Sequence, residues 1–270
     1  MSTTEFTRAA DGTSLLRRSW ESESPRAAIL ITHGLGEHSG RYEHLGTRLS
    51  ESGYAVRAID HRGFGRSGGH RAFVERFDVY LDDLEPEVAD LRSSGLPVVL
   101  YGHSLGGLIA LAYTLGDRTR PDLLVLSAPA VAADIPASKR LAARVLGRVL
   151  PRLMIPNGLT GDQLSRDPAV GEAYFADPLV ITKSTTRLGA EGFRVMDETA
   201  ERVAAGIPVP TLVVHGGADP IVPPAASEPL GHLPGVERVV FPDFRHESHH
   251  EDGGEALVAA VTGWLDRQLG

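Results

Sequence analysis

The stretch VVLYGHSLGGLIALAYTL, residues 98–115, decides the fold, because it places a G-x-S-x-G turn between an apolar run and a helical pattern. Such a turn joins a buried strand to a helix and lifts its serine out at the edge of the sheet. Small residues beside Ser104 let the two backbones pass closely, and the N-terminus of the following helix favours negative charge. The pattern therefore predicts Ser104 as a nucleophile. An ordinary glycine-rich turn is the alternative.

Outward from this turn, short apolar runs alternate with segments of helical spacing. The runs have the character of buried parallel strands, and they cover residues 27–32, 54–59, 98–101, 123–127, 211–214 and 236–240. Helices are expected at residues 41–53, 80–94, 105–115 and 255–269. This alternation predicts a mostly parallel, doubly wound α/β sheet. Residues 5–6 and 15–20 predict an antiparallel hairpin at the sheet edge.

One region interrupts the alternation. Between residues 129 and 206 we expect no buried strand, only helical patches separated by prolines. A stretch of this length is better explained as a helical insertion than as a loop, and ligands of open α/β sheets bind beyond the carboxyl ends of the strands. The sequence therefore predicts a core of residues 1–128 and 207–270, and a helical cap of residues 129–206 over the site.

The composition limits the classes of function. The chain has 270 residues, no cysteine and a formal net charge of -8. The missing cysteines exclude disulfides, cysteine nucleophiles and thiolate metal sites, and the acidic balance argues against nucleic acid as a partner. No apolar run approaches the length of a membrane span, and no signal peptide is visible. We expect a cytoplasmic protein with no obligate protein partner.

A serine nucleophile needs a histidine base and an acid that orients it, and on this kind of sheet the chain order is serine, acid, histidine. His246 follows the last predicted strand, where a loop can bring it beside Ser104; His249 is the main competitor. Asp219 follows the strand at residues 211–214 in a glycine-rich turn before a proline, and a plain Asp-Pro turn is the alternative. The expected triad is Ser104, Asp219 and His246.

Acyl transfer also needs donors aimed at the tetrahedral oxyanion. The turn HGLG, residues 33–36, offers the backbone N–H of Leu35, and the residue after the nucleophile offers that of Leu105. No lysine follows a glycine loop, and no ligand cluster has metal-binding spacing. We therefore expect neither a cofactor nor a metal.

Several motifs together resemble the monoacylglycerol lipases and related lysophospholipase-like α/β-hydrolases of the serine aminopeptidase superfamily. They are HGLGEHSGRY at 33–42, DHRGFGRSGG at 60–69, the turn at 102–107, GGAD at 216–219 and YFADPLV at 174–180. The resemblance implies an α/β-hydrolase fold and the catalytic roles assigned above. It also implies that Arg41, Tyr174 and His249 contact a glycerol headgroup and that Glu37 supports the substrate-binding turn. The residues around His246 depart from the family pattern, because Arg245 precedes it and a polar run follows.

The predicted cap contains a stripe of arginines at every fourth residue, beside an apolar stripe one residue further round the helix. The stripes are Arg140, Arg144, Arg148 and Arg152, and Leu141, Val145, Val149 and Leu153. One interpretation places the apolar side inward and the arginines in water. The other makes this a basic surface that docks on anionic lipid at a membrane or lipid droplet.

These observations predict a cofactor-free serine hydrolase that cleaves carboxylic esters of single-chain lipids, monoacylglycerol foremost, through an acyl-enzyme on Ser104. A carboxylesterase or lysophospholipase with the same triad is the nearest alternative. A ligand-binding homologue without catalysis is more remote, because it is expected to lack a triad member and all three are present.

Overall fold

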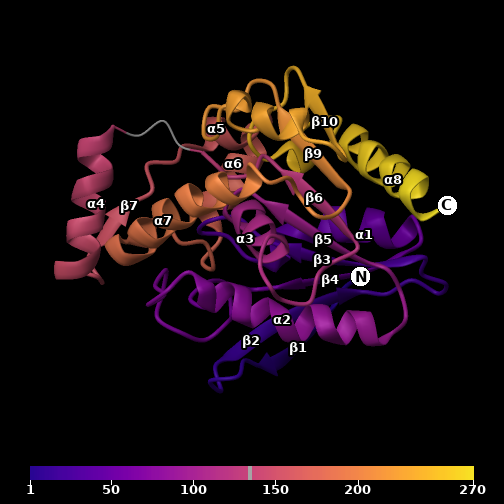
Figure 1. The fold of residues 1–270 in the computed structure, drawn as a ribbon, viewed down its shortest axis with the longest axis horizontal. Coiled ribbons are helices and arrows are strands. Elements are labelled where there is room, and N and C mark those ends of the chain that lie inside the picture. Colours follow the sequence, from indigo (N-terminus) through magenta and orange to yellow (C-terminus); the bar gives the residue numbers. More distant parts are fainter. Residues whose placement is uncertain (133–135) are drawn as a thin grey trace.

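A central sheet organises the computed structural model, which describes residues 1–132 and 136–270 (Figure 1). Within that part of the chain the sheet has eight strands in the order β1-β2-β4-β3-β5-β6-β9-β10. Their bounds are β1 Thr3–Arg8, β2 Ser14–Trp20, β3 Ala27–Thr32, β4 Tyr54–Ile59, β5 Val98–His103, β6 Leu123–Ser127, β9 Thr211–Gly216 and β10 Val236–Phe241. The pairings are parallel except those of β2 with β1 and with β4. The predicted α/β sheet and its edge hairpin are confirmed.

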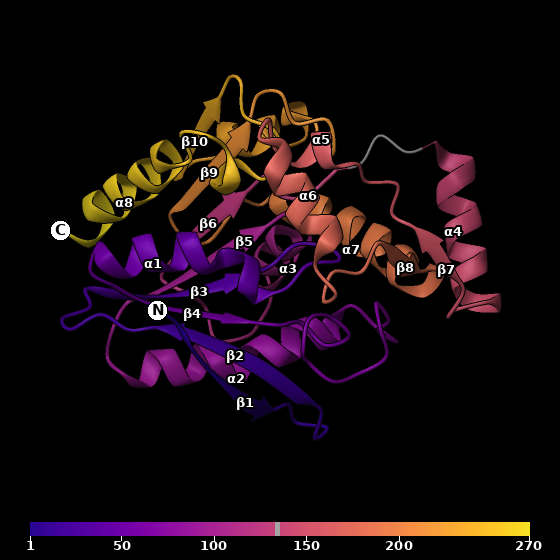
Figure 2. The ribbon, with the colours of Figure 1, turned by 180° about the vertical axis from the view of Figure 1, so that it is seen from behind.

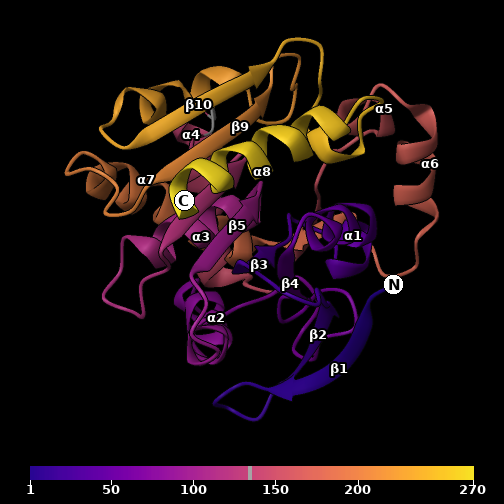
Figure 3. The same ribbon diagram turned by 90° about the vertical axis from the view of Figure 1, so that its right-hand side faces the viewer.

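Two layers of helices cover the sheet (Figure 3). On one face lie α2 (Asp78–Ser93) and α3 (Leu105–Thr114), and on the other lie α1 (Glu43–Glu51) and α8 (Glu255–Leu269). Alternation along the strands divides the core in the same way: Leu30 and Leu100 face α2 and α3, whereas Ile29 and Tyr101 face α1 and α8. The strands between the layers are buried on both faces, which explains their continuous apolar runs.

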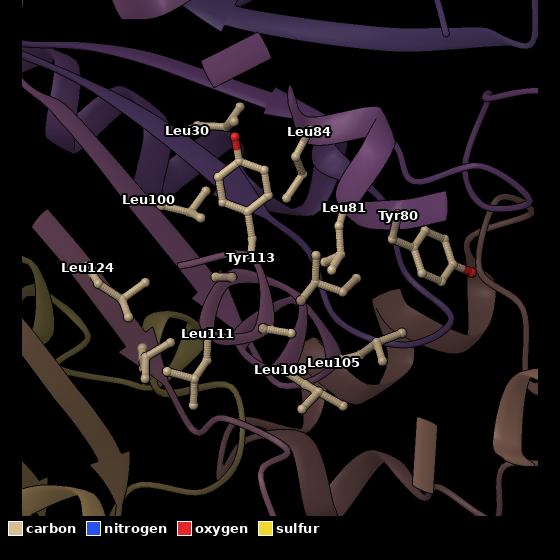
Figure 4. Close-up of a cluster of buried hydrophobic side chains, with 14 of the residues drawn as sticks. Leu30, Tyr80, Leu81, Leu84, Leu100, Leu105, Leu108, Leu111, Tyr113 and Leu124 are labelled. Carbon is tan, nitrogen blue, oxygen red and sulfur yellow. The ribbon is translucent and has the colours of Figure 1, made fainter. Parts of the chain in front are cut away.

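Helix α3 is buried along its whole length. Its side chains Leu105, Leu108 and Leu111 gather with Leu100 and Leu124 of the sheet (Figure 4). Burial of one leucine side chain contributes about 2 kcal/mol, so this cluster holds the N-terminus of α3 firmly against the end of β5. The residue between them, Ser104, is positioned by that packing.

The chain between β6 and β9 leaves the sheet and returns through the expected helices. They are α4 (Ala137–Val149), α5 (Gly161–Leu164), α6 (Pro168–Ala176) and α7 (Thr186–Val203). The structure adds a short antiparallel ribbon of β7 (Met154–Pro156) and β8 (Lys183–Thr185). The sequence analysis missed this ribbon, because its strands have only three residues each and, apart from Thr185, none of them is buried.

Helix α4 lies at the end of the molecule far from α8, and its buried position, Gly147, packs on α7 (Figures 1 and 2). The interpretation that its apolar stripe faces inward is wrong: Leu141, Val145 and Val149 are 59%, 51% and 70% exposed. The inner side of α4 carries small residues and Leu146 instead. The outer side therefore presents apolar side chains to solvent beside the arginines.

Candidate active site

The nucleophile turn connects β5 to α3 at the carboxyl edge of the sheet. Ser104 has φ 53° and ψ -116°, a conformation that costs energy for a residue with a side chain. Its N–H donates to the Ser127 carbonyl at 3.0 Å, and its own carbonyl accepts from Ala130 N at 3.0 Å. These bonds and the buried helix behind them hold the strained turn in place.

Two glycines of the turn are required by close backbone contacts. A Cβ on Gly102 would lie 2.4 Å from the Gly106 carbonyl oxygen, and one on Gly106 would lie 2.0 Å from the Thr32 carbonyl oxygen. The Thr32 hydroxyl also donates to the Gly106 carbonyl at 2.9 Å. The glycines of the G-x-S-x-G pattern are thus required because β3, β5 and α3 approach one another closely.

The candidate acid and base come from the loops after β9 and β10. His246 Nδ1 lies 2.7 Å from Asp219 Oδ2, and both residues are buried. The other oxygen, Oδ1, accepts from the N–H groups of Ile221 and Val222 at 2.8 and 3.0 Å. Because the carboxylate accepts the proton on Nδ1, Nε2 of His246 is left as the basic nitrogen.

A second histidine supports the carboxylate. His215 donates Nε2–H to the Val222 carbonyl at 2.8 Å, and the same nitrogen lies 3.3 Å from Asp219 Oδ2. Burial by itself raises the pKa of Asp219, but hydrogen bonds from His215 and His246 outweigh it and hold that pKa well below its usual value. Asp219 is therefore ionised at neutral pH. The sequence analysis did not select His215 as a site residue.

Ser104 and His246 line one cavity of about 600 Å³. Leu35 and Leu105, the expected backbone donors, line it as well. Its remaining wall is mostly apolar and comes largely from the segment between β6 and β9, including Ala142, Leu146, Ile155, Leu159, Leu164, Leu188, Phe193 and Met196. The roles of the two leucine N–H groups stay predictions, but the geometry brings both residues to the nucleophile.

Glu37 anchors the turn that carries Leu35. Its Oε1 accepts from the Gly34 N–H at 2.6 Å and from the Tyr42 hydroxyl at 2.6 Å. A Cβ on Gly34 would lie 2.7 Å from the same oxygen, so the turn closes tightly around the buried carboxylate. Glu37 also lines the cavity, and its role in substrate binding stays a prediction.

The expected headgroup residues are divided between the cavity and its surroundings. Tyr174 lines the cavity, and its buried hydroxyl has no hydrogen-bond partner within the described residues. Arg41 and His249 are not among the lining residues of this described part. The guanidinium of Arg41 lies 4.7 Å from the centre of the Tyr174 ring, and the His249 ring stacks on Tyr42 at 5.0 Å. The headgroup roles of all three stay predictions.

The structure adds Glu247, a lining residue that the sequence analysis did not select. Arg41 bridges it to the turn, since Nη2 lies 2.5 Å from Glu247 Oε2 and Nε donates to Glu37 Oε2 at 3.1 Å. The available signal was the polar run after His246, which departs from the pattern of the resembled family. Arg41 thus ties the loop of His246 to the turn of Leu35.

Neither a metal site nor a membrane span is found in residues 1–132 and 136–270. No group of three or more metal-ligating side chains converges there. None of the helices is both long and apolar enough to cross a bilayer.

A mostly parallel sheet that presents a serine on a strained strand–helix turn, with a histidine–aspartate pair on the neighbouring loops, defines an α/β-hydrolase. A family model described as serine aminopeptidase, S33, matches residues 23–253. The chain belongs to this family, and the resemblance expected from its motifs is confirmed.

Similarity to known proteins indicates which kind of α/β-hydrolase this is. The chain is 35% identical to a monoacylglycerol lipase of Mycolicibacterium smegmatis over 252 residues, which cover 91% of this chain and 90% of the relative. It is 37% identical to a monoglyceride lipase of Homo sapiens over 224 residues, 78% of this chain and 71% of that one. The crystal structure of a Paleococcus ferrophilus monoacylglycerol lipase superposes with a TM-score of 0.84 at 33% identity, covering 93% and 98% of the two chains. The protein is a carboxylic ester hydrolase that resembles these lipases.

Proposed function

We propose that the protein hydrolyses monoacylglycerols to glycerol and a fatty acid through an acyl-enzyme on Ser104. The observation that carries this proposal is a cavity with Ser104 and His246 in its wall and an apolar lining of the kind an acyl chain needs. The similarity to monoacylglycerol lipases over most of the chain supports the same substrate class. Residues 129–206 act as the cap that supplies much of this lining.

In the proposed mechanism, Ser104 attacks the ester carbonyl while His246 Nε2 takes its proton. The ionised Asp219 orients the imidazole and stabilises the imidazolium that forms. The N–H groups of Leu35 and Leu105 stabilise the tetrahedral oxyanion, and each such donor contributes about 3 kcal/mol to the transition state. The C–O bond to glycerol then breaks, and His246 returns the proton to the leaving oxygen. Water, activated by the same histidine, cleaves the acyl-enzyme and releases the fatty acid.

A comparison of three lauroyl esters tests the substrate class: 1-monolauroylglycerol, lauroyl lysophosphatidylcholine and p-nitrophenyl laurate. Of the two lipids, we expect 1-monolauroylglycerol to have the higher kcat/KM. Preference for the lysophospholipid would replace the proposal with a lysophospholipase. If the protein cleaved only the p-nitrophenyl ester, we would classify it as a general carboxylesterase.

We also propose that α4 docks on an anionic lipid surface. Its exposed side carries Leu141, Val145 and Val149 next to Arg144 and Arg148. The helix contains basic residues and no acidic one. An apolar strip flanked by arginines suits a surface with acyl chains below and phosphate groups above. Docking there would place the cavity wall formed by α4 beside the substrate's own membrane.

Liposome co-sedimentation tests the docking. We expect more protein to bind vesicles with 30 mol% phosphatidylglycerol than phosphatidylcholine vesicles, and the double variant Val145→Ser/Val149→Ser to lose at least about 5-fold in partitioning because it loses apolar burial. Phe6→Ser removes an exposed apolar side chain from the edge hairpin and serves as the matched control. Equal binding by the double variant and the control would contradict the proposal, as would negligible binding to both vesicle types.

A further inference from the structure

Glu247 is a charged residue of the cavity that the proposed mechanism does not use. It follows the base His246 directly and lines the same cavity, although its side chain is only 3% exposed. A buried carboxylate is costly unless its oxygens are paired. The partners of each oxygen therefore show what the group can still bind.

The two oxygens of Glu247 are used unequally. Arg41 Nη2 and His250 Nδ1 lie 2.5 and 2.7 Å from Oε2. Oε1 accepts no hydrogen bond from any residue in the described part of the chain. Burial opposes ionisation, but the bond with His250 and the charge of Arg41 outweigh it and lower the pKa of Glu247 to about 2. The free oxygen thus belongs to a carboxylate that accepts hydrogen bonds and donates none.

The charged groups beside Glu247 are already paired with one another or with the backbone. Glu37 receives three hydrogen bonds, from Gly34, Tyr42 and Arg41. Arg41 divides its guanidinium between Glu37 and Glu247. Burial lowers the pKa of His103 to about 4, so this ring beside His246 is neutral at pH 7. Two carboxylates of the described residues line the cavity, Glu37 and Glu247, and of these two Glu247 has an oxygen to spare for a ligand.

We infer that Glu247 is a specificity-determining residue, whose Oε1 accepts a hydrogen bond from a free hydroxyl of the alcohol half of the ester. This inference rests on the proposed function and refines it: the site selects fatty acyl esters of polyols over esters of alcohols without a second hydroxyl. A polyol supplies the missing donor. An alkyl alcohol would leave the carboxylate oxygen without a partner, at the cost of an unsatisfied charged acceptor.

The test compares 1-monolauroylglycerol with propyl laurate, which has the same carbon skeleton without the two free hydroxyls. Glu247→Gln keeps the shape of the side chain and an oxygen for Arg41, but an NH2 group replaces one carboxylate oxygen. We expect kcat/KM on 1-monolauroylglycerol to fall about 10- to 100-fold, the loss of one hydrogen bond to a charged group. On propyl laurate we expect no loss of kcat/KM, because no hydroxyl is there to be bound and the variant removes the carboxylate charge that this ester leaves unpaired.

Glu251→Gln is the matched control. Glu251 lies on the same loop, is fully buried and accepts from the N–H groups of Arg245 and Arg166, but it does not line the cavity. Any effect of this variant is expected to be equal for the two esters. An equal loss on both esters for Glu247→Gln would overturn the inference and leave Glu247 a positioning residue for His246. Cleavage of propyl laurate but not of 1-monolauroylglycerol by the wild-type enzyme would instead overturn the proposed function.

Discussion

Ser104→Ala is expected to lower kcat on 1-monolauroylglycerol by about 10⁴-fold or more, because no other group can form the acyl-enzyme. The variant keeps its fold, since the bonds that hold the turn are made by the backbone of Ser104 and not by its hydroxyl. Alanine at this left-handed backbone position costs about as much as serine does. The measurement is initial-rate glycerol release, with thermal unfolding as the check on folding.

Ser184→Ala is the control for this loss. Ser184 lines the same cavity, but its hydroxyl donates to the Asn157 side chain at 2.6 Å and has no part in the proposed chemistry. A change below about 3-fold is expected, as for a residue that contributes only to the wall. A Ser104→Ala enzyme with wild-type rates would show that another nucleophile, or no nucleophile, is at work.

Asp219→Asn is expected to lower kcat about 10⁴-fold while the loop around it stays in place. The asparagine oxygen can still accept from the N–H groups of Ile221 and Val222. Its NH2 group would face Nδ1 of His246, reverse the tautomer and remove the charge that stabilises the imidazolium. The loss is therefore expected in kcat, with little change in KM.

Asp243→Asn provides the comparison for this prediction. Asp243 is exposed, three residues before His246 and close in the chain to the candidate base. It is expected to retain nearly full activity, because neutralising it leaves the pair of Asp219 and His246 intact. If Asp243→Asn lost more activity than Asp219→Asn, the assignment of the acid would be incorrect.

The core of this fold could be predicted from the sequence because its strands are buried on both faces. The runs at β3 and β6 are buried at every position, and the observed bounds of β3, β4 and β6 are those expected. The nucleophile turn was equally visible, since Gly102 and Gly106 are dictated by backbone contacts under 2.5 Å that admit no side chain. Local sequence is sufficient to predict the structure where a single packing constraint determines the residue type at each position.

Other features depend on contacts between distant parts of the chain. Arg41 and Glu247 are far apart in sequence, and only the folded loops show that one guanidinium serves both Glu37 and Glu247. Likewise, the period of α4 indicates an apolar side but not which way it faces, and Gly147 decides this by packing on α7. The periodicity of the sequence predicts that α4 has an apolar stripe, but tertiary contacts determine whether that stripe faces the protein or the solvent.

The most direct test of the central claim is labelling with a fluorophosphonate that carries a lauroyl-length chain, followed by peptide mass spectrometry. The account predicts one adduct per chain, on Ser104, formed more slowly when 1-monolauroylglycerol is present because both compete for the same cavity. Absence of an adduct, an adduct on another residue, or a labelling rate that 1-monolauroylglycerol leaves unchanged would contradict it.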